Sequence, residues 1–113
     1  MKKYCLALDL QEEAKLIAAY VDYHKNVWHE IKDSLKEAGI LDMEIYRTGN
    51  RLFMIIKVSA EFSFENKKML DEANPKVQEW ETLMSGFQKP LPGSKPGEKW
   101  ILMERVFKLE PGE

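Results

Sequence analysis

The sequence predicts an α+β fold of the ferredoxin-like type, a split β-α-β sandwich with helices on one face of a mainly antiparallel sheet. The prediction depends on strand patterns of period two, on helical stripes of period about 3.6, and on the order in which the two alternate along 113 residues. That order reads β-α-β-β-α-β. A chain of this length buries enough surface for one core, so we expect residues 1–113 to form a single domain.

The first strand and the first helix are predicted from the N-terminal third of the chain. Apolar residues at every second position predict a strand over residues 3–10. A helix is expected to open at Asp9 or Gln11, because Asp9 and Glu12 have the spacing of a capping box, and to end near Gly39. The apolar stripe of this helix has gaps of three and four residues and consists of Ile17, Val21, His24, Trp28, Ile31 and Leu35.

The remaining elements follow from turn and cap signals. Gly49 and Asn50 suit a tight hairpin turn between strands at residues 43–48 and 51–59. Two helices are expected over residues 63–73 and 76–85, since Asn74 can cap the second and Pro75 suits its first turn. A loop rich in Pro and Gly is predicted over residues 88–98 and a last strand over residues 99–109.

Both faces of the predicted sheet are apolar. In the third strand Leu52 and Met54 lie on one face, while Phe53 and Ile55 lie on the other, and the last strand repeats this pattern. Helices can cover only one of the two faces. A second copy of the chain is therefore expected to cover the other face, which predicts a homodimer.

Composition and charge exclude several functions. With 17 Lys and Arg against 19 Asp and Glu, the net charge of −2 gives no basic excess for binding nucleic acid. No apolar run is long enough to span a membrane. The lone Cys5 and the absence of a secretory signal pattern predict a buried, reduced thiol and a cytoplasmic protein. No metal-ligand spacing or cofactor fingerprint occurs, so we expect chemistry by side chains alone, without metal or cofactor.

The best candidate for chemistry is His24, the strongly polar member of the first helical stripe. Tyr20 and Trp28 lie four residues to either side of it and would share its face. A histidine titrates near neutral pH, and a neighbouring tyrosine can orient a substrate or pass a proton. The alternative is a core histidine satisfied by a backbone carbonyl or by Tyr20. His29 should lie about 140° around the helix from His24 and is expected to be uninvolved.

Trp80 and Glu81 lie next to each other on the predicted helix over residues 76–85. Trp80 falls on an apolar stripe with Val77 and Met84, so its spacing alone favours a place in the core. The same reasoning gives Glu81 a place on the solvated face.

Five segments of the chain together resemble the L-rhamnose mutarotase family. They are residues 20–31 with the Tyr20, His24 and Trp28 ladder, then 44–46, 51–56, 78–84 and 104–107. The resemblance covers nearly the whole chain with similar spacing. It implies a homodimeric, ferredoxin-like α+β barrel, in agreement with the element order and the two-sided sheet.

The resemblance also implies an activity, the interconversion of the α and β anomers of L-rhamnose by an isomerase. Carried over by position, His24 would be the proton donor, while Tyr20 and Trp80 would contact the sugar. The chemistry is consistent with this, because protonating the ring oxygen and removing the anomeric proton opens the ring and lets it close on either face.

Two positions depart from the family pattern within the substrate-binding set. Met43 stands where the family has an aromatic residue, and Glu81 stands where it has a second tryptophan. These changes should alter hydroxyl recognition, so a related 6-deoxyhexose such as L-fucose is an alternative substrate. An alternative of another class is a non-catalytic dimeric barrel that binds a small metabolite.

Overall fold

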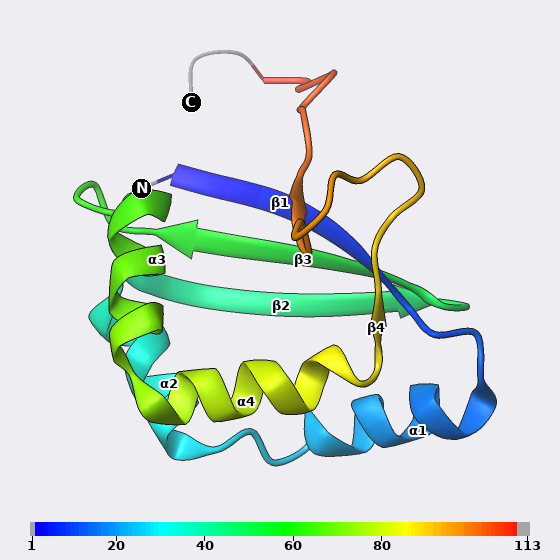
Figure 1. The fold of residues 1–113 in the computed structure, drawn as a ribbon. Helices are drawn as coiled ribbons and strands as arrows, with labels where there is room; N and C mark the ends of the chain where they lie inside the picture. Colours follow the sequence, from blue (N-terminus) through cyan, green and yellow to red (C-terminus); the bar gives the residue numbers. More distant parts are fainter. Residues whose placement is uncertain (1, 111–113) are drawn as a thin grey trace.

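The computed structural model describes residues 2–110. Its elements follow the order β1 (Lys2–Leu10), α1 (Ala14–Tyr23), α2 (His29–Glu37), β2 (Ile40–Thr48), β3 (Arg51–Val58), α3 (Phe64–Ala73), α4 (Pro75–Ser85), β4 (Gln88–Lys89) and β5 (Ile101–Leu102). The predicted alternation of strands and helices is present, and each helical part consists of two helices (Figure 1).

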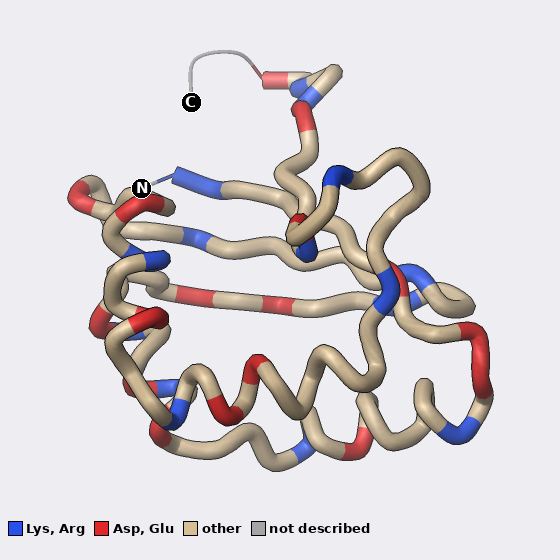
Figure 2. The backbone as a smooth tube through the Cα atoms, in the orientation of Figure 1, with Lys and Arg blue, Asp and Glu red and all other residues tan. Residues whose placement is uncertain are grey.

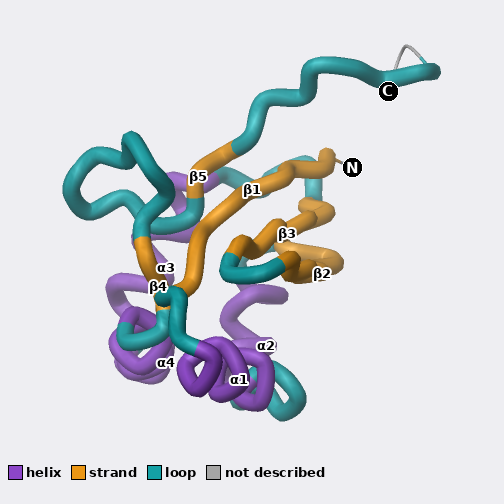
Figure 3. The backbone as a smooth tube through the Cα atoms, turned by 90° about the vertical axis from the view of Figure 1, so that its right-hand side faces the viewer, coloured by secondary structure: helices purple, strands orange, loops and turns teal. Residues whose placement is uncertain are grey.

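The strands form one sheet in the order β2-β3-β1-β4, with β5 also paired to β1. Every pairing within the described residues is antiparallel, and β1 pairs with β3 along its whole length. Figures 1 and 3 show the helices gathered on one side of this sheet. The result is a layer of helices on a layer of strands, as the sequence predicts.

The core lies between these two layers. The residues of β1 and β3 that face the helices alternate with outward-facing ones, and the most deeply buried of them are Leu8, Leu10, Leu52 and Val58. One cluster joins the Leu10 end of β1 to α1, α2 and α4, and a second surrounds Ile56 and Val58. Burying a side chain of this size contributes about 1.5–3 kcal/mol. The core therefore fixes the helices against the sheet.

The prediction of one long helix between β1 and β2 is wrong. The chain forms α1 and α2, separated at residues 24–28, with His24 ending α1 and Trp28 preceding α2 in a non-helical conformation. Both helices contribute to one core cluster, in which Tyr20 of α1 and Ile31 of α2 are buried. The break lets both halves pack on the core.

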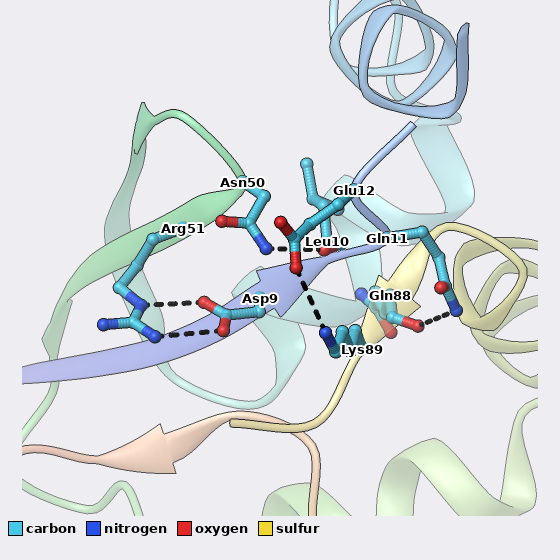
Figure 4. A network of polar contacts seen from close by, with 8 residues as sticks. All are labelled: Asp9, Leu10, Gln11, Glu12, Asn50, Arg51, Gln88 and Lys89. Atoms are coloured by element: carbon cyan, nitrogen blue, oxygen red, sulfur yellow. Dashed lines mark hydrogen bonds and ion pairs between the residues drawn. The ribbon is translucent and has the colours of Figure 1, made fainter. Parts of the chain in front are cut away.

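Asp9 does not cap a helix either. It lies in β1, is 4% exposed, and forms a two-pronged ion pair with Arg51, whose Nε and Nη2 donate to Oδ1 and Oδ2 over 2.8 and 3.0 Å. The residue before α1 is Glu13, which makes no side-chain cap, and Glu12 pairs with Lys89 at 3.3 Å (Figure 4). The predicted capping box of Asp9 and Glu12 is therefore wrong, because Asp9 lies near the end of strand β1.

Two other sequence signals, the Asn74 cap and the Gly49 turn, are confirmed, and Ser63 forms a cap where the first residue of the helix is expected. The Ser63 side chain accepts from the Asn66 backbone at the start of α3, and the Asn74 side chain accepts from Lys76 and Val77 at the start of α4. Each such cap is worth about 1 kcal/mol. Gly49 has the positive φ of 56° in the hairpin between β2 and β3.

The C-terminal prediction is only partly right. The chain pairs with β1 at Ile101 and Leu102, and the Met103 amide still donates to the Cys5 carbonyl over 2.7 Å. Beyond that point it leaves the sheet, as Figure 3 shows, so no strand extends to residue 109. Its apolar side chains are exposed, with Val106 at 88% and Phe107 at 74%. The predicted loop over residues 88–98 also begins as strand β4.

The face of the sheet opposite the helices has no cover within residues 2–110. Phe53 and Ile55 lie on it half-buried, beside a half-buried rather than buried Cys5, while Tyr46 is 54% exposed. Figure 2 shows no charge along the middle of β1 and little on β3. None of the helices within residues 2–110 combines the length and apolar character needed to cross a membrane.

Candidate active site

A cavity of about 760 Å³ lies between the helix-facing side of the sheet and the helices. Its volume is within the range of about 300–1,000 Å³ that is typical of small-molecule sites. All the residues predicted for the site line this cavity: Tyr20, His24, Met43, Trp80 and Glu81. The fold thus brings together positions from α1, β2 and α4.

His24 is held in one orientation by the end of α1. Its Nδ1 lies 2.8 Å from the Tyr20 backbone carbonyl, which can only accept, so Nδ1 carries a hydrogen. The remaining ring nitrogen, Nε2, is then the atom that gains or loses a proton. His24 is half-buried and lines the cavity, so the side chain makes a core contact and also faces the cavity.

The Tyr20 ring packs against the ring of His24. The residue is 3% exposed, and the two ring centroids lie 4.3 Å apart. Burial raises the pKa of Tyr20 to about 12, the Gln88 amide opposes this shift as a hydrogen-bond partner, and the Glu81 carboxylate adds to it. The phenol therefore keeps its proton at neutral pH and can donate a hydrogen bond.

The predicted ladder of Tyr20, His24 and Trp28 on one helix is replaced by a cluster around Trp80. The Trp80 ring makes T-shaped contacts with the rings of His24 and Trp28, at centroid distances of 5.6 and 5.1 Å. Trp28 does not line the cavity, since the break after α1 places it behind Trp80. Aromatic contacts of this geometry fix ring positions and add about 0.5–1.5 kcal/mol each.

Two walls of the cavity differ in polarity. The wall formed by the sheet is apolar and consists of Leu6, Met43, Ile45, Met54 and Ile56. On the opposite side, Glu81 lies 3.6 Å from the Lys99 ammonium, which also donates to the Ser85 hydroxyl over 2.6 Å. A ligand with one apolar and one hydroxylated edge would match this division.

Sequence reasoning missed Gln88, Lys99 and Trp100, which also line the cavity. Gln88 begins the segment predicted as a loop, Lys99 begins the strand predicted after it, and neither belongs to an apolar stripe. Only the pairing of β4 with the end of β1 brings Gln88 to the site. Within residues 2–110 no group of three or more His, Cys, Asp or Glu side chains is placed to hold a metal ion.

The fold and the cavity define a class, a ferredoxin-like α+β protein with a small-molecule site beneath its helices. The crystal structure of an L-rhamnose mutarotase from Formosa agariphila superposes with a TM-score of 0.71 at 26% identity, covering 97% of this chain and all of that one. A dimeric ferredoxin-like protein from an uncultured marine organism, with a TM-score of 0.53 at 12% identity, covers 96% of this chain and 91% of its own. At that identity the second likeness shows the fold alone.

The sequence comparisons show to which protein family the chain belongs. The L-rhamnose mutarotase family model matches residues 3–109. A relative from Xanthomonas campestris named L-fucose mutarotase is 45% identical over 111 residues, which are 96% of this chain and 89% of the relative. The chain belongs to the L-rhamnose mutarotase family. The predicted fold class is confirmed, and so is the predicted enzyme class, an isomerase that interconverts sugar anomers.

Proposed function

We propose that the protein interconverts the α and β anomers of L-rhamnose or a related 6-deoxyhexose such as L-fucose, with His24 as the proton donor. The observation that carries the proposal is the hydrogen bond from His24 Nδ1 to the Tyr20 carbonyl, which leaves Nε2 as the ring nitrogen that can exchange a proton, in a side chain that lines the cavity. Family membership supplies the reaction class. The geometry supplies the group that can give and take back a proton.

The proton movements are simple to balance. Protonated Nε2 of His24 gives its proton to the ring oxygen as the bond between that oxygen and the anomeric carbon breaks. A carboxylate takes the proton of the anomeric hydroxyl, leaving an open-chain aldehyde, and Glu81 is the carboxylate that lines the cavity near Tyr20. Rotation about one carbon–carbon bond and reversal of both transfers closes the ring on the other face.

The two walls suggest how a deoxy sugar is oriented. Its methyl group would contact the apolar wall that includes Met43, while its hydroxyls would face Tyr20 and Glu81. Trp80 offers an aromatic surface against the C–H groups of the ring. The 45% identity to a protein named L-fucose mutarotase favours L-fucose among the 6-deoxyhexoses.

Saturation-transfer NMR on L-rhamnose and L-fucose measures anomer exchange directly and tests the proposal. Replacing His24 with alanine should lower the exchange rate by at least about 100-fold, the contribution of a positioned general acid. His29→Ala is the matched control, because His29 is an exposed histidine on α2 away from the cavity and should leave exchange unchanged. Equal exchange by wild type and His24→Ala would overturn the mechanism. Sugar binding without any exchange would favour the non-catalytic binding module.

The proposal extends to the assembly. A homodimer is supported by the uncovered apolar face of the sheet and by the exposed apolar side chains of residues 102–109. The family match over residues 3–109 supports a single domain over the chain. The free thiol of Cys5 is consistent with a cytoplasmic location.

A further inference from the structure

Trp100 presents an indole ring to the cavity, and no step of the proposed mechanism uses it. The side chain is half-buried, lines the cavity and packs against both core clusters. Trp80 also lines the cavity, but it is only 8% exposed and its ring packs against three aromatic rings, whereas Trp100 makes no such ring contact among residues 2–110. A large aromatic surface at a cavity wall, without an aromatic partner of its own, is available to a ligand.

The chain is held on both sides of Trp100. On the C-terminal side, β5 pairs with β1 through Ile101 and Leu102 (Figure 3). On the N-terminal side, the Lys99 ammonium donates to the Ser85 hydroxyl of α4 over 2.6 Å. Trp100 is therefore attached to the sheet and to a helix at once, so its ring is preorganised for binding rather than carried by a free loop.

The place of Trp100 in the cavity decides which part of a sugar it can contact. Trp100 packs against the second core cluster together with Met43 and Met54, which belong to the apolar wall. The groups that move protons in the proposed mechanism, His24 and Glu81, belong to the helix side. A sugar whose anomeric carbon reaches these two groups turns the other end of its ring, from C3 to C5, to the apolar wall. The C–H groups there carry a slight positive charge and are attracted to the negative face of an aromatic ring.

We propose that Trp100 determines sugar specificity by stacking on the C–H groups at C3, C4 and C5 of a 6-deoxyhexose. This inference rests on the proposed mutarotase function. In L-fucose the hydrogens on these carbons lie on one face of the ring and form an unbroken apolar patch. In L-rhamnose the hydrogen on C4 lies on the opposite face, which interrupts the patch. An indole at this wall therefore favours L-fucose.

The test compares the two sugars on wild type, Trp100→Phe and Trp100→Leu. NMR exchange gives the ratio of kcat/KM for L-fucose to that for L-rhamnose, which does not depend on the fraction of folded enzyme. Trp100→Leu should lower this ratio about fivefold through a higher KM for L-fucose, because a contact away from the anomeric carbon binds substrate and transition state equally. Trp100→Phe keeps an aromatic ring and should retain most of the preference. Phe62→Leu is the matched control and should keep the wild-type ratio, since Phe62 packs half-buried against the same cluster but does not line the cavity.

Two further measurements locate the contact. 6-Deoxy-L-glucose differs from L-fucose in configuration at C4 alone, so wild type should disfavour it and Trp100→Leu should have lost that preference. Tryptophan fluorescence during titration with L-fucose reports binding without catalysis. Trp100→Phe should lose a large part of the fluorescence change, whereas Trp28→Phe should keep it, because Trp28 does not line the cavity.

Several outcomes would overturn the role of Trp100 and leave the mutarotase function intact. They are a wild-type preference for L-rhamnose, an unchanged ratio or an equal loss for both sugars in Trp100→Leu, and a fluorescence change that Trp100→Phe keeps in full. Failure of wild type to exchange either sugar would instead overturn the proposed function.

Discussion

At the scale of single residues, Glu81 is the carboxylate that we propose takes the proton of the anomeric hydroxyl. Glu81→Gln keeps the shape and the contact with Lys99 but removes the ability to take a proton. We expect kcat for the better sugar to fall by roughly tenfold or more, the effect of losing a general base. NMR exchange at saturating sugar measures it. Glu79→Gln is the control, since Glu79 pairs with Lys76 on the exposed side of α4. If exchange and sugar preference were both unchanged in Glu81→Gln, Glu81 would be neither base nor hydroxyl acceptor.

Residue types and spacing were enough to single out Tyr20 and His24, whereas Trp80 and Glu81 were assigned to the site only by the family resemblance. Tyr20 and His24 are four residues apart, a spacing that brings them together in any helix, and Trp80 and Glu81 are adjacent in sequence. Gln88 and Lys99 could not be found in this way. They reach the cavity only because β4 and the chain before β5 lie against β1, a pairing between residues far apart in sequence. Long-range pairing has no local sequence signal beyond its apolar pattern.

At the scale of elements, the turn between α2 and β2 requires glycine. Gly39 has a φ of 95°, and a Cβ there would lie 2.8 Å from the Ser59 hydroxyl oxygen. We expect Gly39→Ala to lower the free energy of unfolding by about 1–3 kcal/mol, from backbone strain plus this contact. Urea denaturation at fixed protein concentration measures the loss.

The hairpin provides a matched control for this prediction. Gly49 has a φ of 56°, and a Cβ there would meet nothing within 4 Å. Gly49→Ala should therefore lower the free energy of unfolding only through backbone strain, by about 1 kcal/mol. Adding Ser59→Ala to Gly39→Ala should restore part of the larger loss, since it removes the contacting oxygen. Equal losses at the two glycines, with no rescue, would show that the Ser59 contact contributes nothing.

The two wrong element predictions have different physical origins. The stripe from Ile17 to Leu35 keeps a helical period, but this period gives no sign that the helix is interrupted at residues 24–28, after which both halves pack in the same core cluster. Residues 99–109 keep the alternation of a strand, yet only Ile101 and Leu102 pair within the chain. The first pattern was overridden by packing within one molecule. The alternation in residues 99–109 is consistent with packing of this segment against a second molecule.

At the scale of the whole molecule, the sheet has helices on one face only. The other face presents Phe53 and Ile55, and the exposed Val106 and Phe107 follow β5. Exposed apolar patches of this extent are typical of interaction surfaces. Helix-facing and outward-facing side chains alternate along β3, so the outward set can change without disturbing the cavity. This separation makes the proposed homodimer testable by substitution.

Sedimentation equilibrium of the wild-type chain should give about twice its mass of 13.2 kDa. Ile55→Glu places a carboxylate on the uncovered face, and burying that charge against a second copy should raise the dissociation constant by about 100-fold. Met69→Glu is the control, because Met69 is 67% exposed on α3, on the helix side of the molecule. Circular dichroism checks that each variant keeps its fold, which is expected because Ile55 faces away from the core. A wild-type chain that stays monomeric at 100-fold higher concentration than the assay, or an Ile55→Glu variant that associates like wild type, would contradict dimerisation through this face.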